Sequence, residues 1–294
     1  MPPLAGGESR GGTGLYCLGT NPSPGPLMSI LKTLLLVSVC TLSAARPPAP
    51  VKTPVAPLLP GEALALAGPD GVVYTFGDAS REVPLGSLAE LVWIKLEGLD
   101  WGSMSVAFNC TGMFKGHPCS NPKGHGRVDL AKALAENCDN AFLAWGQASV
   151  QWWMRDYGEG AARARLEDTF DPFLGNRMPP GEDLPDIEPP WIGQGDLLRT
   201  TPEAMLRWLI DPAQDETVRN VRRLLLTFKQ YNYKDAVWWI HTGTAPEPGV
   251  PAATSAWAVG GNGQITAVLH LPKGKSKADG LARFRTIMMV APDK

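Results

Sequence analysis

A serine and a glutamate, three residues apart at the start of a predicted helix, could together perform nucleophilic chemistry. The pair is Ser87 and Glu90. Side chains at this spacing on a helix lie on one face, one turn apart. A serine hydroxyl is a poor nucleophile and needs a base within hydrogen-bond reach. Glu90 could in principle accept the Ser87 proton, although a carboxylate with its ordinary pKa of about 4 is a weak base.

The same spacing has a second interpretation that needs no chemistry. Ser-x-x-Glu is the capping-box pattern, in which the serine hydroxyl accepts a hydrogen bond from the third helical N–H. The glutamate then returns to the N–H of the capping residue. In this interpretation Ser87 and Glu90 only stabilise the helix start. The sequence leaves both interpretations open.

Four stretches of the chain resemble, in the right order, motifs of the transpeptidase domain of penicillin-binding proteins. The stretches are Pro84–Glu90; Cys110–Gly112 with Gly124–Leu130 and Ala133–Phe142; Ile192–Leu198 with Thr201-Pro202; and His241–Thr244 with Ala256–Gly260. Together they cover most of residues 72 to 271. The corresponding family motifs are Pro-x-Gly-Ser-x-x-Lys, Gly-His-Gly before Ser-x-Asn, Gly-Gln-Gly, and Lys-Thr-Gly-Thr before Ala-Trp. This active-serine superfamily also includes D,D-peptidases and class D β-lactamases.

The resemblance implies a role for each retained residue. Ser87 corresponds to the nucleophile, and the N–H groups of Ser87 and Thr244 would form an oxyanion hole. Thr242 and Thr244 would lie on the strand that pairs with the substrate backbone. Gly243 would let that strand approach closely.

The chain departs from the family at each catalytic motif. The helix lysine is Glu90, the Ser-x-Asn pair is Asn137 and Asp139, and the strand lysine is His241. A neutral imidazole cannot replace the fixed positive charge of lysine toward a carboxylate. Together with Ser87 these four residues are the candidate catalytic set, with degenerate motifs.

Three functions are compatible with this pattern. The first is a catalytically impaired penicillin-binding transpeptidase-domain protein of bacterial peptidoglycan metabolism, a peptide-binding or scaffold module and a pseudoenzyme. Its expected ligands are a peptidoglycan stem peptide or a β-lactam, and its expected partners are cell-wall synthesis proteins. The alternative is an active D,D-transpeptidase, carboxypeptidase or class D-like β-lactamase that uses Ser87 with a rebuilt base, for which Glu90 is the candidate. The sequence does not show whether Lys115 or Lys123 reaches the cleft. The third is a β-lactam sensor or secreted interaction partner.

Three cysteines and two histidines between residues 110 and 138 could form a disulfide or a metal site. Cys110 and Cys119 lie close together in a loop, which favours a disulfide in an oxidising compartment and leaves Cys138 unpaired. A metal set of His117, Cys119 and His125 matches no familiar zinc spacing and lacks a clear fourth ligand. The sequence therefore predicts no metal and no cofactor.

The periodicity of apolar residues predicts an α/β (α+β) fold. Predicted strands are Ala63–Ala67, Val72–Phe76, Ala236–Ile240, Ser255–Val259 and Ile265–Leu271. Predicted helices begin near Ser87 and cover Asp129–Asn137, Glu203–Ile210, Glu216–Phe228 and Asp279–Val290. This order suits a five-stranded antiparallel sheet flanked by helices, with an inserted helical subdomain.

The N-terminal part predicts export. Residues 1–45 are expected to be an extension and signal peptide, with Met28 as the more sensible start and a short apolar run before small residues at a cleavage site. A Pro/Ala-rich linker, residues 46–60, precedes the transpeptidase-like domain, residues 61–294. The predicted location is the periplasm or cell envelope, with membrane attachment only through an uncleaved signal or a lipid on Cys40.

Composition excludes some partners. The chain has 44% hydrophobic and 19% charged residues and a formal net charge of -2. This balance is typical of a globular domain with a substantial core. Without a cluster of Lys and Arg there is no phosphate-tracking face, so no nucleic-acid partner is expected.

Overall fold

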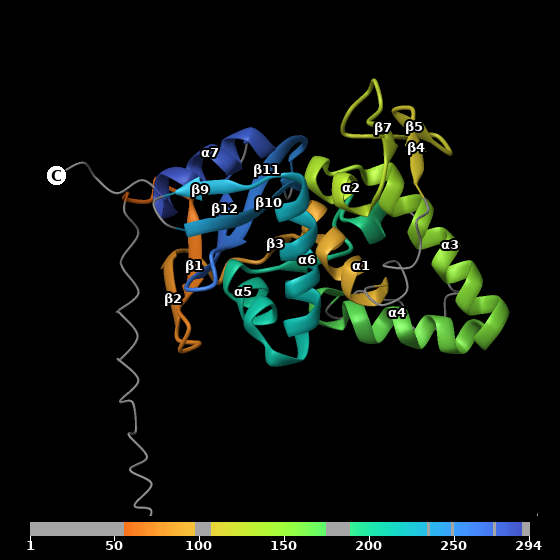
Figure 1. Cartoon of the computed structure of the whole chain (residues 1–294), viewed down its shortest axis with the longest axis horizontal. Coiled ribbons are helices and arrows are strands. Elements are labelled where there is room, and N and C mark those ends of the chain that lie inside the picture. Colours follow the sequence, from red (N-terminus) through yellow and green to blue (C-terminus); the bar gives the residue numbers. More distant parts are fainter. Residues whose placement is uncertain are drawn as a thin grey trace, which may run out of the picture. The chain divides into compact units, whose positions relative to one another are not determined.

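A six-stranded antiparallel sheet forms one side of the protein (Figure 1). The computed structural model describes residues 56–97, 107–174, 189–233, 236–247, 250–272 and 275–289. The predicted signal peptide and most of the linker lie outside these residues. The strands are β1 (Ala63–Ala67), β2 (Val73–Gly77), β9 (Tyr231–Tyr233), β10 (Ala236–Glu247), β11 (Val250–Gly261) and β12 (Thr266–Leu271). Their order across the sheet is β2-β1-β12-β11-β10-β9.

The predicted sheet is confirmed, with one strand more than expected. β9 adds a sixth strand by pairing with the first three residues of β10. Three residues give too short an alternation to be recognised in a sequence. β10 and β11 are also longer than predicted, because Gly, Ala and Pro interrupt the β-branched residues in the added parts of both strands.

The two faces of the sheet are covered by different helices. Side chains alternate along each strand, so Leu64, Ala256 and Ala258 face one side and pack in one core with Phe284 and Ile287. These last two belong to the C-terminal helix α7 (Lys277–Met288), which lies across β10, β11 and β12 (Figure 1). The opposite face belongs to a second and larger core shared with the inserted helices.

The inserted part is mainly helical, as predicted. Its helices are α1 (Ala89–Glu97), α2 (Leu130–Glu136), α3 (Asp139–Tyr157), α4 (Glu159–Leu174), α5 (Pro202–Ile210) and α6 (Asp215–Phe228). Short strand pairs join them: β3 (Val83–Pro84) with β8 (Arg199–Thr200), β4 (Phe108–Cys110) with β7 (Gly126–Val128), and β5 (Met113–Phe114) with β6 (His117–Pro118). Among the described residues, none of the helices combines the length and apolar character of a membrane span.

Helix α1 runs through the interior of the helical part. Its side chains Leu91, Val92, Trp93 and Ile94 are all buried, and they point in every direction around the helix axis. Glu90, in the first turn, is fully buried as well. The fold therefore places the Glu90 carboxyl group among the apolar side chains that pack around α1.

Candidate active site

The turn that carries Ser87 lies directly against strand β10. Gly86–Leu88 form a single 3-10 turn that leads into α1, and Gly86 has φ +60°. A Cβ atom on Gly86 would lie 2.3 Å from the carbonyl oxygen of Thr244, and one on Gly243 would lie 3.1 Å from Ser87 Cβ. Both glycines are therefore needed for this close approach. The candidate nucleophile and the Thr-Gly-Thr strand, distant in the sequence, are brought together.

Strand β10 has an edge free of strand pairing beside Ser87. β9 pairs only with Ala236–Trp238, and no other strand of the described residues joins β10 on that side. The Thr242 carbonyl accepts a hydrogen bond from Asn137 Nδ2 at 2.5 Å, so it faces away from β11. Because backbone groups alternate along a strand, the N–H and carbonyl of Thr244, two residues later, face the same side as the Thr242 carbonyl. The predicted oxyanion donor, Thr244 N–H, therefore lies on this edge.

The other stretches that resemble family motifs also converge on this turn. Trp257 on β11 donates a hydrogen bond through Nε1 to the carbonyl oxygen of Pro84 at 3.0 Å. A Cβ atom on Gly193 would lie 1.8 Å from the carbonyl oxygen of Gly86. Two segments from the second half of the chain, around Gly193 and Trp257, thus contact the Ser87 turn and the residue before it.

The alternative prediction of a capping box at Ser87 is wrong. The residue that caps the 3-10 turn is Leu85, which makes no side-chain hydrogen bond to the turn. Both carboxyl oxygens of Glu90 are buried without a hydrogen-bond partner among the described residues. The capping box fails because Glu90 points into the core instead of back to the helix start. Ser87 itself is nearly buried, at 8% exposed.

Glu90 and His241 form a buried pair next to Ser87. The His241 Nε2 atom lies 3.8 Å from Glu90 Oε2 and 3.3 Å from the carbonyl oxygen of Ser87. Because a carbonyl only accepts hydrogen bonds, Nε2 carries the hydrogen and donates it to Ser87. Burial, with a smaller contribution from Asp139, raises the pKa of Glu90 well above its usual value. Burial also lowers the pKa of His241 to about 4, so the uncharged form of each group is favoured.

Asn137 and Asp139, which stand where the family has Ser-x-Asn, make different contacts. Asn137 ends α2 in the left-handed conformation, at φ 53°, and its amide reaches Thr242 on β10. Asp139 begins α3, and its Oδ2 atom accepts a hydrogen bond from the N–H of Ser120 at 3.2 Å. Burial, and then the nearby Cys119, raise the pKa of Asp139 to about 6. Asn137 thus contacts the free edge of β10, whereas Asp139 contacts the loop beside it.

One charged residue near the site, Lys277, was missed by the sequence analysis. Its Nζ atom donates a hydrogen bond to the carbonyl oxygen of Glu136 at 3.3 Å. Its positive charge partly opposes the rise that burial causes in the pKa values of Glu90 and Asp139, and adds to the lowering of the His241 pKa by burial. It is the first residue of α7, far from every motif, so no spacing signal points to it. The two lysines considered from the sequence lie elsewhere. Lys115 donates to Gln147, and the N–H of Lys123 donates to Asn121 within its own loop.

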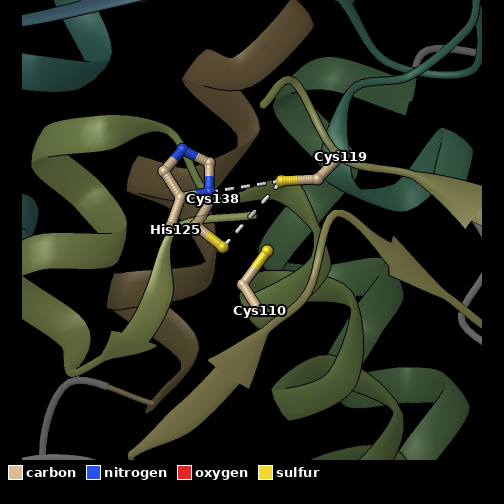
Figure 2. A group of neighbouring side chains, drawn as sticks. All are labelled: Cys110, Cys119, His125 and Cys138. Atoms are coloured by element: carbon tan, nitrogen blue, oxygen red, sulfur yellow. Dashed lines mark hydrogen bonds between the residues drawn. The ribbon is translucent and has the colours of Figure 1, made fainter. Parts of the chain in front are cut away.

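A cluster of three thiols and an imidazole lies behind Asn137 and Asp139. The Cys110–Cys119 disulfide, which the sequence left open, is not formed, because Cys110, Cys119 and Cys138 are all free thiols. Figure 2 shows their sulfur atoms together with Nδ1 of His125, each directed toward the others. These four residues could hold a metal ion, whereas His117, considered from the sequence, is outside the group. Hydrogen bonding from Cys138 lowers the pKa of Cys119, and the same bond with burial raises that of Cys138.

Sequence comparison finds no relatives, but comparison of folds does. No protein-family model and no curated protein matches the chain. The structure is similar to PBP2 of Pseudomonas aeruginosa, at 16% identity, with a TM-score of 0.52 over 75% of this chain and 71% of that one. It is similar to the class D β-lactamase OXA-427, at 21% identity, with a TM-score of 0.52 over 76% and 93% of the two chains.

A third solved structure extends the range of functions found on this fold. It is the C-terminal domain of the Bacillus licheniformis BlaR penicillin-receptor, at 12% identity and a TM-score of 0.50, covering 76% of this chain and 86% of that one. At these identities the likeness concerns the fold. The chain has the mixed α/β fold of penicillin-binding transpeptidase domains and class D β-lactamases.

Proposed function

We propose that this chain is a penicillin-binding-type protein of the bacterial cell envelope that binds a peptidoglycan stem peptide without acylating itself. The observation that carries the proposal is the buried Glu90–His241 pair at 3.8 Å. It occupies the positions where the resembled motifs have two lysines. A carboxyl group whose protonated form is favoured by burial cannot take the Ser87 proton, and a neutral imidazole gives no fixed positive charge.

Retention of a binding edge supports the second half of the proposal. An extended peptide can add a strand to an exposed sheet edge through main-chain hydrogen bonds. The outward-facing N–H of Thr244 is suited to this, whereas the Thr244 carbonyl oxygen lies against Gly86 of the Ser87 turn. The Thr242 carbonyl is already bound by Asn137, so a peptide must displace that amide or pair only beyond it. Export to the envelope, and docking with cell-wall synthesis proteins, belong to the same proposal.

Calorimetric titration of the purified full chain with a synthetic stem peptide ending in D-Ala-D-Ala tests the binding claim. Binding is expected, and Ser87→Ala should leave it unchanged because the hydroxyl takes no part. Thr244→Pro removes the outward N–H at an edge position where proline is tolerated, and should abolish binding. The matched control is the same peptide ending in L-Ala-L-Ala. No binding by the parent chain, or equal binding by Thr244→Pro with an unchanged melting temperature, would overturn the proposal.

The same titration distinguishes a chain that only binds the peptide from the alternative, an active acyl-serine enzyme. The close approach of Ser87 to Gly243 on β10 is the observation that favours it. An active enzyme would consume the peptide, releasing D-alanine with time, and Ser87→Ala would stop the release. Release that also depends on Glu90 would show that the carboxyl group serves as the base.

A further inference from the structure

We propose that Cys110, Cys119, His125 and Cys138 bind one zinc ion in a closed, structural Cys₃His site. The inference is independent of the proposed function, because it rests on a different group of residues. It concerns a part of the molecule where sequence spacing gave no recognised metal pattern.

The ligand atoms have the separations that tetrahedral zinc requires. Zinc–sulfur bonds of about 2.3 Å and zinc–nitrogen bonds of about 2.0–2.1 Å place neighbouring ligand atoms about 3.5–3.8 Å apart. Here Cys119 Sγ lies 3.4 Å from His125 Nδ1 and 4.0 Å from Cys138 Sγ. All four ligand atoms, including Cys110 Sγ, lie within 4.8 Å of one another (Figure 2). Shortening the longest of these separations by up to about 1 Å would complete the tetrahedron.

The chemistry of the donors selects zinc over the harder cations. Thiolate and imidazole ligands suit zinc, whereas magnesium and calcium prefer oxygen atoms. Cys110, Cys119 and Cys138 are buried, and His125 is only partly so. Four protein ligands leave no open position for water or substrate, which is the arrangement of structural rather than catalytic zinc sites.

Local structure explains how four separate segments supply the ligands. Cys110 ends β4, and Gly126, the residue after His125, pairs with it in the β4–β7 ladder. Cys119 directly follows β6, and its N–H donates to the Gly112 carbonyl at 2.9 Å. Cys138 precedes α3. The ligands are therefore 9, 6 and 13 positions apart, without the Cys-x₂-Cys spacing that usually reveals such a site.

Hydrogen bonds also hold the backbone beside the proposed ligands. The Lys132 ammonium donates to the carbonyl oxygen of His125 at 2.8 Å and so fixes its loop. A disulfide between any two thiols would leave the third buried and unpaired, whereas one zinc ion uses all three.

The site is connected directly to the free edge of β10. Cys138 lies between Asn137, which binds Thr242, and Asp139. Ser120, next to Cys119, donates its hydroxyl to the Asn137 carbonyl at 2.8 Å and its N–H to Asp139. A zinc ion would therefore hold the Asn137 segment against the strand.

Metal analysis of the purified full chain tests the inference. We expect one zinc per chain after dialysis against a weak chelator. The reduced, metal-free chain should bind cobalt and show the visible absorption of a tetrahedral thiolate centre. His125→Asn should weaken zinc binding more than about 100-fold. Cys110→Ser should do the same, whereas His117→Asn, a neighbouring histidine outside the cluster, should leave stoichiometry and affinity unchanged.

Two results would overturn the site. One is the absence of zinc after expression in zinc-supplemented medium together with the absence of a tetrahedral cobalt spectrum on reconstitution of the parent chain. The other is a zinc content that survives His125→Asn but is lost in His117→Asn. Because the cobalt titration uses the unmodified chain, the test does not depend on whether the cysteine variant folds.

Discussion

The imidazole of His241 lies 3.8 Å from the carboxyl group of Glu90, and both side chains are almost fully buried. Two groups that would form an ion pair in water are here each favoured in the uncharged form, because burial penalises both charges. This pair replaces the two positive charges that the resembled family keeps around its serine. Its titration therefore has consequences for stability that can be measured.

Glu90→Gln should remove a loss of stability that sets in as pH rises above 4.5. The unfolded chain loses the Glu90 proton near pH 4.5, whereas the folded chain retains it to higher pH. The free energy of unfolding therefore falls as pH rises through that window, by at most about 1.4 kcal/mol per pH unit. Urea unfolding between pH 6.5 and 8 should show a smaller decline for Glu90→Gln than for the parent chain. Glu216→Gln, an exposed control, should keep the parent decline; equal declines for Glu90→Gln and the parent would show that Glu90 is ionised in the fold.

His241→Gln should remove a loss of stability that the parent chain shows as pH falls, opposite in direction to the effect of Glu90. Its folded pKa of about 4 lies below the unfolded value of 6.5, so the unfolded chain binds an extra proton between them. Stability contributed by neutral His241 is therefore complete above pH 6.5 and is lost as pH falls toward 4. The stability difference between parent and variant should change by at most about 1.4 kcal/mol per pH unit in this window.

His270 provides a matched comparison for that measurement. It is also buried, its pKa is lowered to about 4 mainly by burial, and it packs against Trp257 away from Glu90. His270→Gln should change the slope of the free energy of unfolding against acid pH by a similar amount. The double variant should change this slope by the sum of the two. A His241→Gln slope identical to that of the parent chain would show that His241 is already charged.

Gly243→Ala should separate the Ser87 turn from β10. The added methyl group would lie 3.1 Å from Ser87 Cβ, tighter than ordinary contact, in a packed environment. Overpacking of this kind costs about 1–3 kcal/mol. Gly160→Ala is the control, since nothing lies within 4 Å of a Cβ there and the position is helical. Chemical unfolding should show a clear loss for Gly243→Ala and no loss for Gly160→Ala, and equal stabilities would argue that Ser87 does not touch the strand.

Asn137→Gly should expose the Thr242 carbonyl while preserving the left-handed backbone at this position. Losing the hydrogen bond should lower the free energy of unfolding by about 0.5–1.5 kcal/mol. Affinity for the stem peptide should rise several-fold, because the peptide no longer displaces an amide. Unchanged or weaker binding by Asn137→Gly would show that peptides do not use the Thr242 carbonyl.

Most of the sheet and the central contact of the site were predictable from sequence. β1 was predicted with its observed bounds, and the Asp129–Asn137 helix prediction matches α2 with its two capping residues. Four motif-like stretches in one order were sufficient to place Ser87 beside Gly243. Strand alternation is a local property of the sequence, and motif order follows the chain, so both can be recognised without the three-dimensional structure.

The orientation of Glu90 and the thiol cluster were not predictable in the same way. Ser-x-x-Glu is compatible with a cap or with an inward-facing carboxyl group, and only the packing around α1 decides between them. The run Leu91-Val92-Trp93-Ile94 was the available signal, since a helix that is apolar on all sides is buried on all sides. The thiol cluster depends on four chain segments meeting in space, and their spacing matches no local motif.

Intact-mass measurement of the full chain with and without benzylpenicillin, beside Ser87→Ala, shows whether Ser87 is acylated. The parent chain and Ser87→Ala should each keep their own mass after prolonged incubation with benzylpenicillin, because the protonated Glu90 does not activate Ser87. A mass increase equal to one penicillin in the parent chain, absent from Ser87→Ala, would contradict this prediction.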